Sequence, residues 1–327
     1  MPRKKFKHVK KFLPFIGIVL LIGYILWKLD VEDIKIAFLK ISPIFVFLSI
    51  TLTIPRVLIR SHAWHFILKE QKIKIGYWQT LKIFLIGYFY GSFTPGYLGQ
   101  LMRIPYLKEK TDQPYGKLFV NSVIETTSHT LSAYFVILIG SVLIIEQIPQ
   151  LFIIVLIWIL ILAALIIYFI GKNRGEKLLF GLIKYFIPKR AKSNLKEFVK
   201  TFYNGFPRIH RLIYPVFLGF LTWIIIFSQE YIFVIALGLE IPYLHFLIFF
   251  PIANAAGFLP ISFAGLGPRE ITAILIFTTL FPSVTGEEIL VVSVMGFIIT
   301  DLITGFIGFL VSLTETTEHK LTTPSVT

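Results

Sequence analysis

The amino-acid sequence predicts an all-α protein that crosses a membrane several times. Hydrophobic residues make up 56% of its 327 residues and charged residues only 15%, with a mean hydropathy of +0.79. Soluble domains carry about 25% charged residues, and disordered chains are poor in hydrophobic ones, so both classes are excluded. Several stretches with at most one charge also reach about 20 residues, the length that crosses a bilayer core of about 30 Å as a helix.

Six segments are predicted to span the membrane fully. They are residues 12–27, 41–55, 118–145, 151–170, 212–239 and 289–314. The first follows six Lys or Arg residues and precedes no small-residue cleavage site, so we expect a retained helix rather than a signal peptide. The second is followed directly by Arg56 and Arg60. It can span only if these arginines extend toward lipid phosphates at the membrane surface or face protein, and we expect the first.

Two further apolar segments, 83–102 and 241–268, are rich in glycine and proline and are predicted to be broken or re-entrant helices. Pro95 and Pro260 mark the expected breaks. Interrupted backbone at membrane depth is tolerated only where protein buries it or where it lines a water-filled cavity. The sequence leaves open whether the second segment re-enters or crosses, which gives six or eight crossings.

The distribution of basic residues predicts the orientation in a cell membrane. Lys and Arg gather at the N-terminus and in the loops 69–82, 103–117 and 172–211. Because the cytoplasmic loops of membrane proteins carry the basic excess, we place these loops and both termini in the cytoplasm. Residues 184–190 and 195–206 are expected either to lie as amphipathic helices on anionic lipid or to form a solvated linker.

The two broken segments resemble each other. Each carries Phe-x-Pro, then glycine, then arginine, with eight residues from Pro95 to Arg103 and nine from Pro260 to Arg269. Corresponding breaks in two halves of a chain are typical of transporters with an internal, often inverted, repeat. The alternative is a chance likeness between two glycine- and proline-rich loops.

The repeat predicts how the chain is organised. We expect a single transmembrane domain, 1–327. It would consist of a first half 1–171, a basic linker 172–211, a second half 212–314 and a C-terminal tail 315–327.

The run Leu259-Pro-Ile-Ser-Phe-Ala-Gly-Leu-Gly-Pro-Arg-Glu270 resembles the transmembrane family of lysylphosphatidylglycerol synthases and flippases, whose members move aminoacylated lipids across the bilayer. The stretch from Pro95 to Arg103, followed by Glu125, is similar to that family's proline–glycine–arginine element. The resemblance implies a lipid translocator (flippase). Lipid aminoacylation is not expected, because no soluble aminoacyl-transferase domain follows Thr327. Thr126 and His129 stand where family members often have arginine and aspartate.

The resemblance and the residue types together suggest a site for a lipid headgroup. Arginine binds phosphate through two parallel hydrogen bonds, so Arg103 and Arg269 are the expected phosphate-binding residues. Gly99, Gly265 and Gly267 would permit close approach of the backbone. An anionic or phosphate-bearing membrane lipid is therefore the expected partner.

Three acidic residues complete the expected site. Glu125 and Asp301 each lie in the long helix that follows a broken segment, where a charge is expensive and needs a partner. We expect them to hold the arginines when the site is empty, or to meet a cationic headgroup. Glu270 is the third intramembrane acid. The alternative is an internal arginine–acid pair that only fixes helix packing.

Two other functions compete with translocation. A membrane glycosyl- or lipid-transferase using a polyprenyl-phosphate donor would need acids such as Asp30, Glu32 and Asp33, although apolar residues at helical spacing follow and favour the start of a surface helix. A partner subunit without transport of its own is the third hypothesis.

The sequence gives no sign of several other chemistries. It has no cysteine, no nucleotide-binding P-loop and no histidine–acid spacing typical of a metal site. We therefore expect no cofactor, no metal and no enzyme activity. Its basic residues, which give a formal net charge of +14, are scattered between apolar runs, so nucleic acid is not an expected partner.

Overall fold

The computed structural model describes residues 16–94, 97–143, 145–146, 149–170, 177, 192–257 and 265–322. These residues form helices and contain no strand. In chain order the helices are α2 (Ile16–Lys28), α3 (Val31–Lys40), α4 (Pro43–Thr51), α5 (Thr53–Glu70), α6 (Tyr77–Ser92), η2 (Leu98–Met102), α7 (Arg103–Thr111), α8 (Tyr115–Leu143), α9 (Pro149–Ile170), α11 (Lys192–Asn204), η4 (Ile209–Leu212), α12 (Ile213–Ala236), α13 (Tyr243–Ala256), α14 (Pro268–Leu280), α15 (Gly286–Phe297), η5 (Ile298–Ile303) and α16 (Thr304–Thr322).

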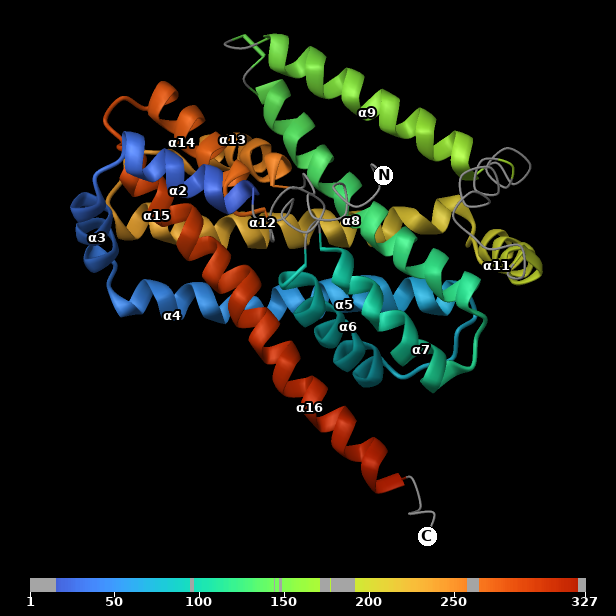
Figure 1. Cartoon of the computed structure of the whole chain (residues 1–327). Coiled ribbons are helices and arrows are strands. Elements are labelled where there is room, and N and C mark those ends of the chain that lie inside the picture. Colours follow the sequence, from blue (N-terminus) through green and yellow to red (C-terminus); the bar gives the residue numbers. More distant parts are fainter. Residues whose placement is uncertain are drawn as a thin grey trace, which may run out of the picture. The chain divides into compact units, whose positions relative to one another are not determined.

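The predicted all-α class is confirmed (Figure 1). Pro95, Pro260 and residues 184–190 lie outside the described residues.

Long apolar helices confirm a polytopic membrane protein. Four helical runs are long and apolar enough to cross a bilayer: Pro43–Glu70, Tyr115–Leu143, His210–Ala236 and Gly286–Thr314. Shorter apolar helices include Gly17–Lys28 and Phe152–Leu165. The second of these lies within α9, a helix of 22 residues. The first of the four runs continues through Arg56 and Arg60 to Glu70, so both arginines lie inside a helix rather than at its end.

The chain divides into two compact units. Unit 1 consists of residues Met1–Leu58, Lys82–Met102 and Thr222–Thr327, and unit 2 consists of Ile59–Leu81 and Arg103–Leu221. Each unit is assembled from segments far apart in the sequence. These units do not coincide with the halves 1–171 and 212–314, and the internal repeat stays a prediction.

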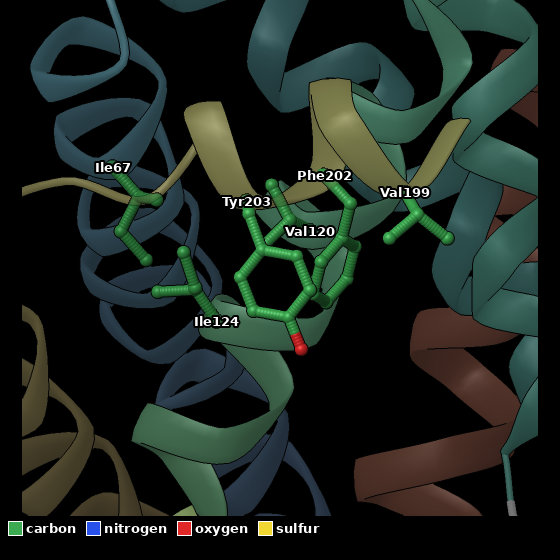
Figure 2. Close-up of a cluster of buried hydrophobic side chains, with 6 residues drawn as sticks. All are labelled: Ile67, Val120, Ile124, Val199, Phe202 and Tyr203. Carbon is green, nitrogen blue, oxygen red and sulfur yellow. The ribbon is translucent and has the colours of Figure 1, made fainter. Parts of the chain in front are cut away.

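Helix α8 forms the centre of unit 2, where α11 packs directly on it. A cluster of buried side chains joins α5, α8 and α11: Ile67, Val120, Ile124, Val199, Phe202 and Tyr203 (Figure 2). Gly116 at the start of α8 lies so close to Thr201 and to the Phe198 carbonyl that a Cβ atom would collide with both. α11 is amphipathic as expected, but protein covers its apolar face. The expectation of a lipid-bound or solvated segment is therefore wrong for residues 195–206.

In unit 1, α13 and α14 form an antiparallel helical hairpin. At one end the ring of His245 packs edge-on against Phe281, with centroids 5.9 Å apart. At the other end, a Cβ atom on Gly265 would lie 3.0 Å from the Cα atom of Gly257. Each helix is about 20 Å long at 1.5 Å per residue, short of a bilayer core of about 30 Å. Neither helix is therefore long enough to cross on its own, and the choice between re-entry and crossing stays a prediction.

The first broken segment also folds back on itself. After α6 ends at Ser92, Gly99 lies directly against the carbonyl oxygen of Tyr90, where a Cβ atom would not fit. The Gly99 amide donates to the hydroxyl oxygen of Thr94 (2.7 Å), and that hydroxyl donates to the same Tyr90 carbonyl (3.0 Å). This local hydrogen bonding satisfies the backbone where the helix is interrupted. Helix α7 then starts at Arg103.

The helix starts follow from capping residues. Asp30 precedes α3, and its carboxylate accepts the backbone amides of Glu32 (2.8 Å) and Asp33 (3.2 Å). Thr285 and Glu288 form a capping box at the start of α15. The interpretation of residues 30–33 as a helix start is therefore confirmed.

Candidate functional site

Each unit buries a group of arginine and acidic side chains. The Arg103 centre in unit 2 consists of Arg60, Trp64, Arg103 and Glu125. The Arg269 centre in unit 1 consists of Arg56, Tyr88, Tyr97, Glu230, Arg269, Glu270 and Asp301. Charges inside membrane segments are costly and mark functional sites by default, so both centres are candidates.

In the Arg103 centre, two arginines share one carboxylate. Arg103 is the first residue of α7 and Glu125 lies in the middle of α8; they are 1% and 3% exposed. The Arg103 Nη2 atom donates to Glu125 Oε2 at 2.5 Å, and the Arg60 Nε atom donates to Glu125 Oε1 at 3.3 Å. The structure therefore brings the expected arginine and acid together.

The Arg103 guanidinium lies over the ring of Trp64. The guanidinium carbon lies 4.9 Å from the centre of the Trp64 ring, a cation–π distance. The indole N–H donates to Asn121 (2.6 Å), Asn121 donates to Gln71 (2.7 Å), and Gln71 donates to the Gly205 carbonyl (2.6 Å). A connected hydrogen-bond network of this kind fixes the orientation of its members.

The Arg103 centre has a surplus of positive charge. Two guanidiniums face one carboxylate, and these three side chains together carry a formal charge of +1. The Arg103 Nε atom is buried and has no hydrogen-bond partner among the described residues. An anion with several acceptor oxygens would satisfy this donor and balance the charge.

Arg60 was expected to extend toward lipid phosphates at the membrane surface. That expectation is wrong, because the Arg60 side chain is only 12% exposed and contacts Glu125. The available signal was Glu125 itself, a lone acid in an apolar helix that needed compensation.

In the Arg269 centre, Arg269 is held by its neighbour in sequence. Its Nε and Nη2 atoms both donate to Glu270 Oε1, at 2.9 and 2.6 Å. The other oxygen of Glu270 accepts the Gly267 amide at 2.6 Å, and Ser293 of α15 contacts both side chains. The Nε and Nη2 donors of Arg269 are therefore engaged inside the protein.

The glycines of the second broken segment allow backbone segments of the protein to touch. Gly267 has φ +102°, a conformation that favours glycine, and a Cβ atom there would collide with the Gly17 carbonyl of α2. Gly265, with φ +83°, lies against Gly257. The observed close approach is to other backbone of unit 1.

Asp301 lies among hydroxyl groups rather than beside an arginine. Its Oδ1 atom is 3.1 Å from the Tyr97 hydroxyl and 3.3 Å from the Tyr88 hydroxyl, and its Oδ2 atom accepts from Thr300 at 2.9 Å. In the described part of the chain Asp301 forms no ion pair. Asp301 therefore does not pair directly with an arginine, although it interacts electrostatically with Arg269 at longer range, and its expected role at the site stays a prediction.

Arg56 is the second arginine of this centre, and the sequence-based expectation for it was also wrong. It is 2% exposed, and its Nη2 atom donates to the Thr300 carbonyl (3.0 Å) and the Thr304 hydroxyl (2.6 Å). Thr300 lies in η5, a π-helical turn between α15 and α16. Such turns release carbonyls from regular helix bonding and are frequent at functional sites.

Glu230 of α12 is the single charge of the predicted span 212–239 and was not among the expected site residues. It is 2% exposed, and its Oε2 atom has no hydrogen-bond partner within the described ranges. Its side chain packs on Gly296 of α15, where a Cβ atom would lie 2.6 Å from Glu230 Cγ. Its carboxylate interacts electrostatically with Arg56, Arg269, Glu270 and Asp301.

Comparison with known proteins identifies related sequences along almost the entire chain. The family model described as "Lysylphosphatidylglycerol synthase TM region" matches residues 12–308. A UPF0104 membrane protein of Methanocaldococcus jannaschii is 23% identical over 334 residues, covering 97% of this chain and 99% of the relative. The family match includes both broken segments and all residues of both centres.

Proposed function

The chain belongs to the lysylphosphatidylglycerol synthase TM region family, and from this premise we propose that it moves a phosphate-bearing lipid between the two leaflets of the membrane. Membership of this family suggests a lipid-related role at the membrane. Our proposal adds that this role is the movement of the lipid from one leaflet to the other. The headgroup binds at the Arg103 centre.

The surplus positive charge of the Arg103 centre carries this proposal. A headgroup phosphate has an anionic charge and several acceptor oxygens, and a guanidinium presents donors in a planar fork that matches them. Arg103 keeps its Nε donor unpartnered among the described residues, while Trp64 holds the guanidinium in place. A phosphate there would remove the formal surplus of +1.

Glu125 has a separate role in this mechanism. In the empty site it holds Arg103 and Arg60 in position, since each of its oxygens accepts one arginine. A phosphate competes with Glu125 for the same donors. Departure of the lipid restores the internal ion pairs, so Glu125 makes headgroup binding reversible.

Arg269 remains a second proposed phosphate contact with a smaller expected effect. Glu270 already occupies two donors of Arg269, on its Nε and Nη2 atoms. The transferase alternative gains no support from Asp30, Glu32 and Asp33, because Asp30 caps α3 and Glu32 pairs with Lys35.

We also propose a cell-membrane location with the basic loops in the cytoplasm. The flanks of α8 test this orientation. A reporter fused after Lys110 should lie in the cytoplasm and one after Glu146 outside, because only the first position lies in a basic loop. The opposite pattern would contradict the orientation.

The function is tested by reconstituting the purified full chain in vesicles that contain a fluorescent phosphatidylglycerol analogue. Arg103→Ala should slow its movement about tenfold or more, since a charged hydrogen bond is worth about 1.5–3 kcal/mol. Arg103→Lys should restore the rate only in part, because lysine lacks the planar fork.

The matched control is Arg211→Ala, which removes an arginine that is 52% exposed. It should leave the rate unchanged. Movement by a folded Arg103→Ala variant at the parental rate would overturn the proposal.

A further inference from the structure

We propose that Glu230 is a proton-binding site, and that its protonation controls whether the Arg269 centre accepts an anionic headgroup. The second part rests on the proposed function, whereas proton binding does not. The argument depends on charge balance, on hydrogen bonding and on the packing of α12.

The Arg269 centre holds more acids than bases. Glu230 faces charged groups from three other elements: Arg56 on α5, Arg269 and Glu270 on α14, and Asp301 on η5. Two guanidiniums and three carboxylates give a formal charge of −1. An unbalanced charge is expensive in a buried site, and one bound proton removes the imbalance.

Hydrogen bonding singles out the carboxyl that takes the proton. Glu270 accepts two donors of Arg269 and the Gly267 amide, and Asp301 has three hydroxyl groups around it. Both oxygens of each of these two acids therefore already accept a hydrogen bond. Glu230 Oε2 has no such donor among the described residues.

The position of Glu230 is fixed by the residues beside it. The preceding residue, Gln229, donates to the Ser49 carbonyl (2.8 Å) and to the Thr53 hydroxyl (3.0 Å), and Ser49 donates back to the Gln229 carbonyl (3.0 Å). On its other side, the Glu230 side chain packs on Gly296. The carboxyl therefore stays in the centre in both protonation states.

The proton step changes the charge of the centre. A hydronium ion transfers its proton to Glu230 Oε2 and leaves as water, an O–H bond forms, and the formal charge of the centre rises from −1 to 0. An anionic phosphate is repelled from Arg269 in the first state and no longer repelled in the second. Because linkage is reciprocal, binding of the phosphate must favour uptake of the proton by the same factor.

Proton binding can be measured without any transport. The full chain in lipid nanodiscs is examined by pH-difference infrared spectroscopy from about pH 5 to about pH 9, which covers the range of buried carboxyls. We expect a carboxylic-acid C=O band that Glu230→Gln abolishes. Glu32→Gln should keep the band, because the Glu32 side chain is 66% exposed. A band that persists in Glu230→Gln, or no titrating band in the parent, overturns the assignment.

Control of lipid movement is measured in the same phosphatidylglycerol vesicles with and without a pH gradient. The parent rate should change with pH by up to about tenfold per pH unit, the limit for one proton. The Glu230→Gln rate should be independent of pH, and Glu230→Asp should restore the dependence.

The two hypotheses fail in different ways. No lipid movement by the parent protein would contradict the proposed function and leave the infrared result standing. Movement that ignores pH, or an unchanged pH response in Glu230→Gln, would overturn the control by Glu230 and leave the proposed function intact.

Discussion

The Arg103 centre and the Arg269 centre use the same side-chain types but balance their charges in opposite directions. Around Glu125, two arginines share one carboxylate, and the formal charge is +1. Around Arg269, three carboxylates meet two arginines, and the formal charge is −1. The first arrangement favours an anion, and the second favours a cation or a proton.

The two centres differ in the position, along the sequence, of the acid that pairs with the arginine. Arg103 and Arg269 both open a helix after a broken segment, at its first and second residue. Arg103 finds its acid 22 residues later on another helix, whereas Arg269 finds it in the next residue. Similar sequence motifs therefore place two arginines differently. Arg103 keeps an Nε donor without a partner among the described residues, whereas the Nε atom of Arg269 donates to the neighbouring Glu270.

The largest expected effect is that of Glu125→Gln. The amide keeps the size of the side chain but leaves Arg103 and Arg60 without their shared carboxylate, a formal charge of +2. Removing one partner of a buried ion pair costs about 3–5 kcal/mol. Equilibrium unfolding in mixed detergent micelles measures this loss, and a free energy of unfolding equal to that of the parent would contradict the shared ion pair.

Glu270→Gln should cost less, about 1.5–3 kcal/mol, the range for a hydrogen bond to a charged group. Arg269 loses its partner, but Glu230 and Asp301 remain within electrostatic range. The same unfolding experiment compares the two centres directly. If Glu270→Gln proves more damaging than Glu125→Gln, the assumed compensation by the neighbouring acids is wrong.

Glu230→Gln sharpens the contrast further. The amide resembles the protonated acid and removes the unbalanced charge, so the free energy of unfolding should change by about 1 kcal/mol or less. This acid is as buried as Glu125. A loss as large as that of Glu125→Gln would show that Glu230 is an essential ion-pair partner instead.

The smallest effect is expected from Glu32→Ala combined with Asp33→Ala. Both side chains lie in the first turn of α3, outside both centres. Surface changes of this kind usually stay within about 0.5 kcal/mol, and lipid movement should continue at the parental rate. Loss of activity with folding intact would favour the transferase hypothesis.

Much of the fold could be predicted from the sequence, because hydropathy and helix breaks are local properties. The long apolar helices and the interruption between α13 and α14 follow from runs of apolar residues and from glycine and proline positions. The packing of the apolar face of α11 against α5 and α8 could not be predicted in this way. Its pattern indicates one apolar face, but Val199 and Phe202 meet α8 and α5 only in the folded chain.

The candidate site was predicted in part. A lone acid in an apolar helix signalled Glu125, and the broken segments signalled Arg103 and Arg269. The partners of Arg56 and Asp301 could not be deduced. They depend on contacts between residues more than 200 positions apart, such as Arg56 with Thr304 and Tyr97 with Asp301.

Native mass spectrometry of the full chain in mild detergent tests the central claim most directly. The claim is that the surplus charge of the Arg103 centre binds a phosphate headgroup. The parent protein and Arg211→Ala should each retain a phosphate-bearing lipid, and Arg103→Ala should retain about tenfold less. Equal retention by a folded Arg103→Ala variant would contradict the claim.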